Sequence, residues 1–149
     1  YAENYIKGNK FVEGVRKIDL MGGKVSQLGD DFVNVDIIAE KGIRGSATDL
    51  SKFIRPNSID EIVCSNPQAE FIEQASKILK KNGKIYINGT EKNTFFSSIT
   101  HKRLKDLKLN VISEKQPLNE KFKHLNFYFS DGVRKIPNTS MRTTILQKK

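Results

Sequence analysis

Short runs of apolar and β-branched residues alternate with segments of helical periodicity along this chain, and this alternation limits the possible folds more than any other feature. The pattern predicts helices over 68–81 and 94–107, and strands over 15–21, 32–38, 59–64, 84–88, 110–114, 126–130 and 143–147. Strands that alternate with helices are typical of an α/β fold with a mostly parallel sheet flanked by helices. The last two strands are expected to form an antiparallel pair at the C-terminal end of the chain.

The length of 149 residues is that of one domain, which we expect to span residues 15–149 after a polar lead-in over residues 1–14. No apolar run reaches the roughly 20 residues that a membrane-spanning helix needs. Cys64 is the single cysteine, which excludes an internal disulfide and a cysteine-based metal cluster. The sequence therefore predicts a globular domain without a metal site.

Charge is distributed unevenly between the two halves of the chain. Residues 1–76 hold 9 Lys and Arg against 12 Asp and Glu, a net charge of −3, whereas residues 77–149 hold 17 against 5, a net charge of +12. Such asymmetry favours a polyanionic partner such as RNA, although a solvated basic surface is the alternative. The expected nucleic-acid contacts are Lys102, Arg103, Lys105, Lys121, Lys123, Arg134 and Lys135.

Polar and glycine residues follow several of the predicted parallel strands. In such sheets, ligands bind beyond the carboxyl ends of the strands, where Gly22, Asp36, 65–68 and 88–90 are expected to lie. The Asp36 carboxylate can accept two hydrogen bonds from ribose hydroxyls, and the alternative is an acid that caps a turn. The strand ends therefore predict a nucleoside site.

Five segments, read in order, resemble the motifs of class I S-adenosylmethionine-dependent methyltransferases. They are 17–23, 32–36, 47–50, 56–67 and 78–85. The resemblance implies a Rossmann-like fold, truncated at its N-terminal side, in which Gly22 and Gly23 form the glycine loop. It assigns ribose to Asp36 and the adenine amine to Asp49, and helix capping is an open alternative for Asp49. A Lys24 after the two glycines departs from the G-x-G-x-G spacing of that family.

The segment Ser65-Asn66-Pro67-Gln68 resembles the Asn-Pro loop of methyltransferases that act on amino groups. In those enzymes a carboxamide and a backbone carbonyl hold the target nitrogen, which makes Asn66 a candidate site residue. Gln68 stands where that family has an aromatic residue, so no stacking platform for a flipped base is evident from the sequence. The alternative is that Asn66 and Pro67 simply begin the following helix.

A second resemblance spans nearly the whole chain and is to the C-terminal toxin domains of contact-dependent growth inhibition and other polymorphic toxin proteins. It is carried by Gly22-Gly23, 34–37, 60–63, 67–69, 85–90 and 143–146. It implies a transfer-RNA nuclease at the tip of a large secreted or cell-surface protein, delivered into the cytoplasm of a target cell. The implied partners are a cognate immunity protein and a host-cell cofactor protein, and the absent initiator methionine is expected of such a tip.

Metal-independent RNA cleavage needs a base, an acid and a cation. His101 and His124 are the only imidazoles, and both lie in the basic half. Thr90, Asn93 and Asp131 fall at predicted strand ends and offer a hydroxyl, an amide donor and a base. The catalytic residues are therefore predicted to be His101, His124, Thr90 and Asp131, with surface histidines as the alternative.

The interpretation that joins these features is an antibacterial transfer-RNA nuclease toxin without a cofactor. The first alternative is a nucleic-acid methyltransferase that uses S-adenosylmethionine. The second alternative is a non-catalytic module that binds RNA or a nucleotide.

Overall fold

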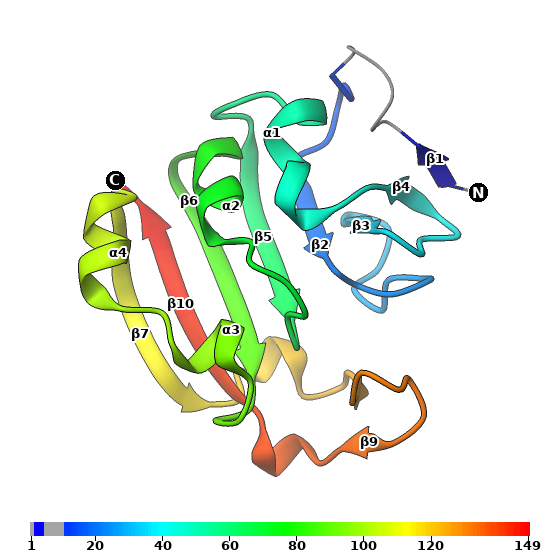
Figure 1. Cartoon of the computed structure of the whole chain (residues 1–149), viewed down its shortest axis with the longest axis vertical. Coiled ribbons are helices and arrows are strands. Elements are labelled where there is room, and N and C mark those ends of the chain that lie inside the picture. Colours follow the sequence, from blue (N-terminus) through cyan, green and yellow to red (C-terminus); the bar gives the residue numbers. More distant parts are fainter. Residues whose placement is uncertain (1, 5–10) are drawn as a thin grey trace.

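A computed structural model describes residues 2–4 and 11–149 and shows an eight-stranded sheet in the order β1-β4-β3-β2-β5-β6-β10-β7 (Figure 1). Its strands are β1 (Ala2–Asn4), β2 (Lys17–Leu20), β3 (Val33–Asp36), β4 (Gly42–Arg44), β5 (Ile59–Ser65), β6 (Leu79–Gly89), β7 (Leu109–Pro117) and β10 (Arg142–Lys148). Strands β1 to β6 pair in parallel, and β10 lies antiparallel between β6 and β7. The predicted Rossmann-like α/β fold with an antiparallel strand pair is confirmed.

The members of the antiparallel pair differ from the expectation. The segment predicted as a strand over 126–130 contains only β8 (Phe127–Tyr128), which pairs with β9 (Lys135–Ile136) in a separate two-stranded sheet. Strand β10 instead pairs with β7, because six of the seven residues of β10 have matching partners there and only two residues of β8 are extended.

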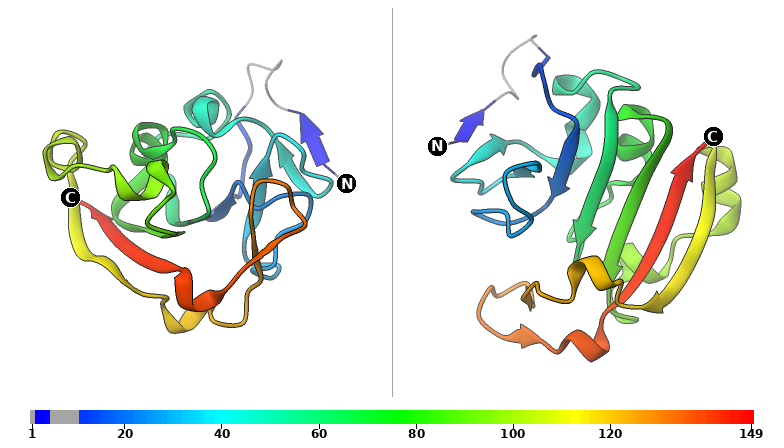
Figure 2. Two further views of the ribbon diagram at one scale, coloured as in Figure 1. Left: turned by 60° about the horizontal axis from the view of Figure 1, so that its bottom comes forward. Right: turned by 180° about the vertical axis from the view of Figure 1, so that it is seen from behind.

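The α-helices lie on one face of the sheet, which Figure 2 shows from a tilted view and from behind. They are α1 (Leu50–Phe53), α2 (Ile72–Ile78), α3 (Thr94–Ser97) and α4 (His101–Asp106), and the 3-10 helix η1 (Ala47–Asp49) precedes α1. The helix predicted over 94–107 is broken, since Thr100 begins a new helix by accepting a hydrogen bond from the Arg103 amide at 3.2 Å. The helix predicted over 68–81 ends at Ile78, and Asn82 lies in β6 with a φ of 69°.

A hydrophobic core fills the space between these helices and the sheet. Ile18, Ile62 and Ile85 contribute from the strands, and Phe53 and Ile72 contribute from the helices. All five are at most 2% exposed. Burial of this apolar surface is the main contribution to the stability of the fold.

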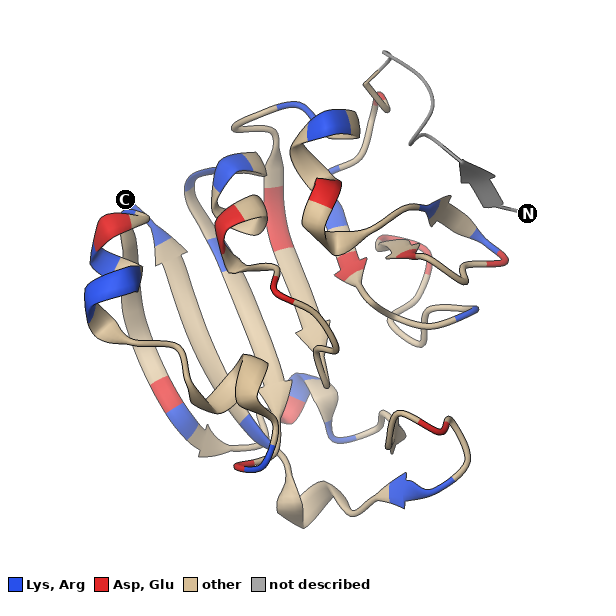
Figure 3. Cartoon of the chain, in the orientation of Figure 1, with Lys and Arg blue, Asp and Glu red and all other residues tan. Residues whose placement is uncertain are grey.

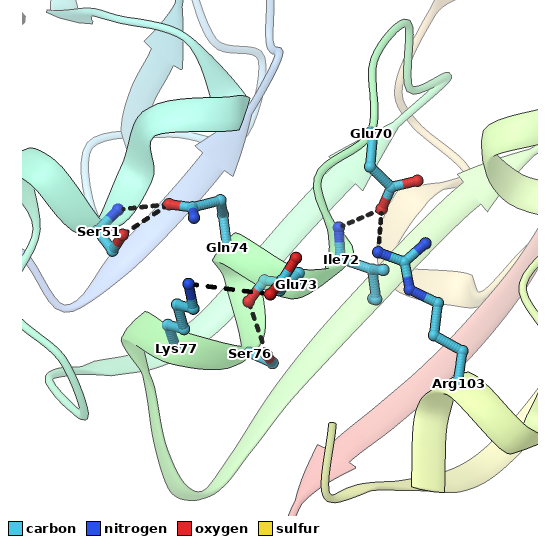
Figure 4. A network of polar contacts seen from close by, with 8 residues as sticks. All are labelled: Ser51, Glu70, Ile72, Glu73, Gln74, Ser76, Lys77 and Arg103. Carbon is cyan, nitrogen blue, oxygen red and sulfur yellow. Dashed lines mark hydrogen bonds and ion pairs between the residues drawn. The ribbon is translucent and has the colours of Figure 1, made fainter. Parts of the chain in front are cut away.

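Polar contacts fix the helices relative to one another (Figure 4). The Gln74 Oε1 atom on α2 accepts hydrogen bonds from the amide and the hydroxyl of Ser51 on α1, both at 2.8 Å. The Glu70 carboxylate pairs with Arg103 on α4 at 3.0 Å and accepts a hydrogen bond from the Ile72 amide at 3.3 Å. These contacts hold α1, α2 and α4 in place over the sheet.

The opposite face of the sheet is covered in part by residues 118–141, which we call the insert because they separate β7 from β10. The insert contains β8, β9 and the 3-10 helices η2 (Glu120–Phe122) and η3 (Asn138–Ser140). Phe122, Leu125 and Phe127 of the insert pack against Val63 and Tyr86 of the sheet. None of the helices in the described ranges is long and apolar enough to cross a membrane.

Candidate functional site

A cleft of about 830 Å³ lies at the carboxyl ends of β2 and β5, between these strand ends and the insert. After β2 the chain continues to β3 and β4 on one side, and it then returns to β5 on the other side of β2. The carboxyl edge at such a reversal of strand order is where open α/β sheets bind ligands. The volume is within the range of small-molecule and cofactor sites. Residues from both sides line it: Asp19, 21–25, Gln27, Leu28, Ile38, Glu40, Ser65, Asn66, Gln68 and 125–132.

A tight turn follows β2 and forms the floor of the cleft. Met21 and Gly23 both have left-handed backbones, with φ of 59° and 84°. A Cβ atom on Gly22 would lie 2.4 Å from Asn34 Oδ1 and 2.6 Å from Asp19 Oδ2, so only glycine fits there. Gly23 has no heavy atom within 4 Å of the place where a Cβ would be. The turn therefore leaves open space in which a ligand can approach the backbone.

Asp36 ends β3 beside this turn, as the sequence predicts. Its Oδ2 atom accepts a hydrogen bond from the Gly23 amide at 2.8 Å, and its Oδ1 atom accepts one from the Ile38 amide at 3.0 Å. Each carboxylate oxygen has a second lone pair that can accept another hydrogen bond. Asp36 thus acts as a turn acid, the alternative considered from sequence, and keeps acceptor capacity for hydroxyl groups of a ligand.

Asp19 is a site residue that sequence reasoning did not single out. It lines the cleft, is 5% exposed, and accepts a hydrogen bond from the Ser26 hydroxyl at 2.6 Å. Burial raises the pKa of this carboxyl to about 6. The hydrogen bond from Ser26 lowers the pKa and the nearby Asp36 charge raises it, and both effects are smaller than that of burial. An acid between buried Ile18 and Leu20 was the sequence signal that could have identified it, because charged residues are rarely buried without a purpose.

The lining of the cleft is acidic. It contains three carboxylates, Asp19, Glu40 and Asp131, and one cation, Lys24. The Lys24 ammonium lies 4.0 Å from Glu40, and its side chain is 68% exposed. Such a lining attracts positively charged ligands and repels phosphates.

The far wall of the cleft is held by two side chains from the sheet edge. Gln27 makes two hydrogen bonds to the backbone of Asn126, at 2.9 and 3.0 Å. Asn66 donates to the Tyr128 carbonyl at 2.7 Å. These contacts join segments that are 99 and 62 residues apart in the chain, so the closed cleft exists only after the insert has docked.

A second pocket of about 270 Å³ adjoins the cleft and shares Asn66, Gln68, Phe129 and Ser130 with it. The other lining residues come from the Asn-Pro loop, the segment after β6 and β9: Pro67, Thr90, Lys92, Asn93, Thr94, Phe95 and Ile136. Phe95 and Phe129 are aromatic residues beside the Asn-Pro loop that the sequence did not reveal, because the insert brings Phe129 to the loop from a distant part of the chain.

The other predicted site residues do not form one centre. His101 begins α4, where its Nε2 atom lies 2.6 Å from Glu114, and His124 follows η2 in the insert. Thr90 lines the second pocket and Asp131 lines the cleft, where Arg134 and two backbone amides lower the pKa of Asp131 to about 2. Neither Asp36 nor Asp49 lines the cleft itself: Asp36 borders it through its hydrogen bond to the lining residue Gly23, and Asp49 pairs with Lys52 at 3.1 Å.

The predicted nucleic-acid contacts are spread around the molecule, as Figure 3 shows for all Lys and Arg. Lys102, Arg103 and Lys105 lie on α4, Lys121 and Lys123 at η2, and Arg134 and Lys135 at β9. Four of the seven are in ion pairs: Arg103 with Glu70, Lys121 with Glu61, Lys123 with Glu120 and Arg134 with Asp131. The basic half of the sequence therefore does not form one basic face in the described part of the chain.

No known family model and no curated protein matches this sequence. Solved structures do match it. The antibiotic-resistance methyltransferase Kmr has a TM-score of 0.56 at 9% identity, over 91% of this chain and 88% of that one. A methyltransferase from Haloferax volcanii, solved with the activator Trm112, has a TM-score of 0.55 at 13% identity, over 92% and 84%. A 30S ribosomal methyltransferase from an uncultured bacterium has a TM-score of 0.52 at 15% identity, over 89% and 87%.

These comparisons correct the main functional interpretation. The prediction of a transfer-RNA nuclease toxin without a cofactor is wrong, because the solved structures that share the fold are methyltransferases, and none of the comparisons shows a toxin context. The same neighbours contradict the expected absence of a cofactor, since methyltransferases of this kind use S-adenosylmethionine. The chain has the class I methyltransferase fold.

Proposed function

We propose that this chain is an S-adenosylmethionine-dependent methyltransferase that binds its cofactor in the cleft. The observation that carries the proposal is an acidic lining next to a left-handed glycine turn, at the carboxyl edge where strand order reverses. S-adenosylmethionine carries a sulfonium and an ammonium group against one carboxylate, so an acidic cleft favours it. A phosphate-bearing dinucleotide would be repelled by the same carboxylates.

The residues present fit this cofactor. Gly23 leaves free space beside the turn, and the Asp36 carboxylate keeps lone pairs for ribose hydroxyls. Asp19 supplies negative charge for the cationic groups. When bound, the cofactor supplies an electrophilic methyl group. Lys24, the residue that departs from the family motif, is exposed and directed to Glu40, so it does not place an unpaired cation in the cleft.

The chain's own part in the reaction is to orient the acceptor and exclude water. Leu125 and Phe127 of the insert give the far wall an apolar surface, and Asn66 lines both the cleft and the second pocket. A methyl acceptor in the second pocket would therefore meet the cofactor beside Asn66. Holding both partners in one geometry is a major source of rate acceleration in group transfer.

A nucleic acid is the acceptor that we propose. The net charge of +9 favours a polyanion. Lys92 lines the second pocket, and Lys135 of β9 stands next to its lining residue Ile136, so cations flank the acceptor side while the cofactor side is acidic. One structural neighbour is a 30S ribosomal methyltransferase. Delivery into other cells, an immunity protein and a host-cell factor stay predictions that no observation tests.

Calorimetric titration with S-adenosylhomocysteine tests the cofactor site. We expect binding to the wild type, and Asp36→Asn should weaken it by about 10- to 100-fold, because hydrogen bonds to a charged group contribute about 1.5–3 kcal/mol. The exposed Asp31→Asn variant is the charge-matched control and should bind normally. Absence of binding to the wild type would contradict the proposal. Binding without methyl transfer from labelled S-adenosylmethionine to total RNA would indicate a non-catalytic module.

A further inference from the structure

One side-chain amide of the protein is held by two oxygens of the Asn-Pro loop. The Asn93 Nδ2 atom donates hydrogen bonds to two oxygens at once, Asn66 Oδ1 and the Pro67 carbonyl, both at 2.9 Å. Two acceptors from consecutive residues thus converge on a single NH2 group. An exocyclic amine on a ligand has the same two donors and would compete for the same place.

The acceptor pair is held by contacts that do not depend on Asn93. Asn66 has a left-handed backbone with a φ of 50°, and its amide donates to the Asn88 carbonyl at 2.7 Å. Its Nδ2 atom donates to the Tyr128 carbonyl at 2.7 Å, which fixes the side-chain amide with Oδ1 directed toward Asn93. Because Pro67 is buried, its carbonyl has little freedom to move. The pair therefore stays in place when Asn93 leaves.

Asn93, in contrast, is positioned to leave. It lies in the turn after β6, and its Oδ1 atom accepts a hydrogen bond from the Phe95 amide at 3.0 Å at the start of α3. Its two functional groups have separate tasks, since the oxygen caps the helix and the nitrogen fills the acceptor pair. A side chain that keeps the oxygen and loses the nitrogen can therefore separate these tasks.

Two aromatic side chains border the same place. Phe95 and Phe129 line the second pocket, and Phe129 is 42% exposed with the Arg134 guanidinium 4.9 Å from its ring centre. Aromatic rings and arginine planes are the surfaces on which unpaired bases stack. The volume of about 270 Å³ suits one planar ring system more than a whole nucleotide.

We propose that Asn93 is a built-in competitor for the methyl acceptor, which is an unpaired nucleobase with an exocyclic amino group. The base stacks on Phe129 and displaces the Asn93 amide from Asn66 and Pro67. Discrimination follows from this arrangement, because a base with a carbonyl in place of the amine would set oxygen against oxygen. The inference rests on the proposed function, since it identifies the acceptor of that reaction.

Calorimetry with nucleoside pairs tests the inference on the whole chain, with S-adenosylhomocysteine present in excess. Adenosine is compared with inosine, and cytidine with uridine, because each pair differs in an amine against a carbonyl. In Asn93→Ser, which keeps a capping oxygen, we expect the amine-bearing member of at least one pair to bind several-fold more tightly and its partner to be unchanged. Asn93→Asp is the second variant, in which a carboxylate oxygen facing Asn66 Oδ1 should open the pair in the same way.

Phe129→Leu should weaken binding of the amine-bearing nucleoside by about 5- to 100-fold, the loss of one stacked base. Phe11→Leu is the matched control, because Phe11 is a similarly exposed ring with Arg55 5.1 Å from its centre. Equal gains for amine and carbonyl nucleosides in both Asn93 variants, or normal binding in Phe129→Leu, would overturn the inference. Absence of S-adenosylhomocysteine binding to the wild type would instead contradict the proposed function. The nucleoside pairs can then still be compared without it, so the two failures are distinguishable.

Discussion

The two walls of the cleft are built in different ways. The wall of residues 15–90 consists of parallel strand ends, backed by a core whose members are almost fully buried, and its turn, its acid and its Asn-Pro loop each come from a short stretch of sequence. The opposite wall is the insert, which has two strands of two residues each and a smaller hydrophobic cluster. Local motifs therefore form the proposed cofactor side and the Asn-Pro loop, and long-range docking adds the insert wall that faces them.

The two walls of the cleft also differ in how strongly they are held. Strands β2, β5 and β6 are held by backbone hydrogen bonds on both sides, so the cofactor wall can open only with the whole sheet. The insert is tied by side-chain contacts such as those of Gln27 and Asn66, and segments held in this way open at a lower free-energy cost. The insert is thus the part of the site that can move when a substrate enters.

The largest expected effect tests whether the insert unfolds together with the sheet. Phe122 is 1% exposed and packs edge-to-face against Tyr86 with ring centres 5.7 Å apart. Phe122→Ala should lower the free energy of unfolding by about 3–5 kcal/mol, measured by urea denaturation. Tyr128→Ala, at an exposed ring of the same insert, is the control and should change it by less than about 0.5 kcal/mol. A small effect of Phe122→Ala would mean that the insert opens independently.

The next effect concerns the cofactor wall and its dependence on pH. The pKa of Asp19 is about 6 in the folded chain, whereas a solvent-exposed aspartate, as in the unfolded chain, has a pKa of 3.8. The folded state therefore binds the extra proton more tightly, and this stabilisation is complete below about pH 3.8 and is lost as pH rises through 6. We expect a loss of about 3 kcal/mol across this window.

Urea unfolding at pH 4 and pH 7 measures this change. Asp19→Asn should remove the contribution, because the amide cannot ionise and can still accept the Ser26 hydrogen bond. Asp31→Asn, at an exposed acid, should show the same change in the free energy of unfolding between pH 4 and pH 7 as the wild type. If Asp19→Asn loses as much stability between pH 4 and pH 7 as the wild type, the pKa of Asp19 is not raised in the folded chain.

The smallest effect is expected at the histidines. His101 has a side chain that is 70% exposed and is paired with Glu114 across the surface, away from both pockets. His101→Gln should change the free energy of unfolding by less than about 1 kcal/mol and leave S-adenosylhomocysteine affinity unchanged. The same affinity is expected for His124→Gln. A loss of cofactor binding in either variant would mean that the insert or α4 contributes to the cofactor wall.

The two walls differ in how far the local sequence specifies them. The strands before Gly22 and Asp36 were predicted because buried strands have continuous apolar runs, and the ligand edge followed from their parallel order. The strand expected over 126–130 was mostly wrong, because only Phe127 and Tyr128 are extended and they pair with β9 in a separate two-stranded sheet, while Phe127 packs against the main sheet with its side chain. Asp19 was missed because its burial and its hydrogen bond from Ser26 are set by the folded turn after β2.

The amino-acid sequence alone determined the α/β class, the parallel order around Gly22 and Asp36, and the acid that ends β3, because apolar periodicity and strand-end residues are properties of short segments. Only the tertiary structure decided which charges gather in the cleft and that the ring of Phe129 stands beside Asn66. Those outcomes depend on contacts between residues 60 to 100 positions apart, such as Asn66 with Tyr128 and Gln27 with Asn126, and no local pattern encodes them.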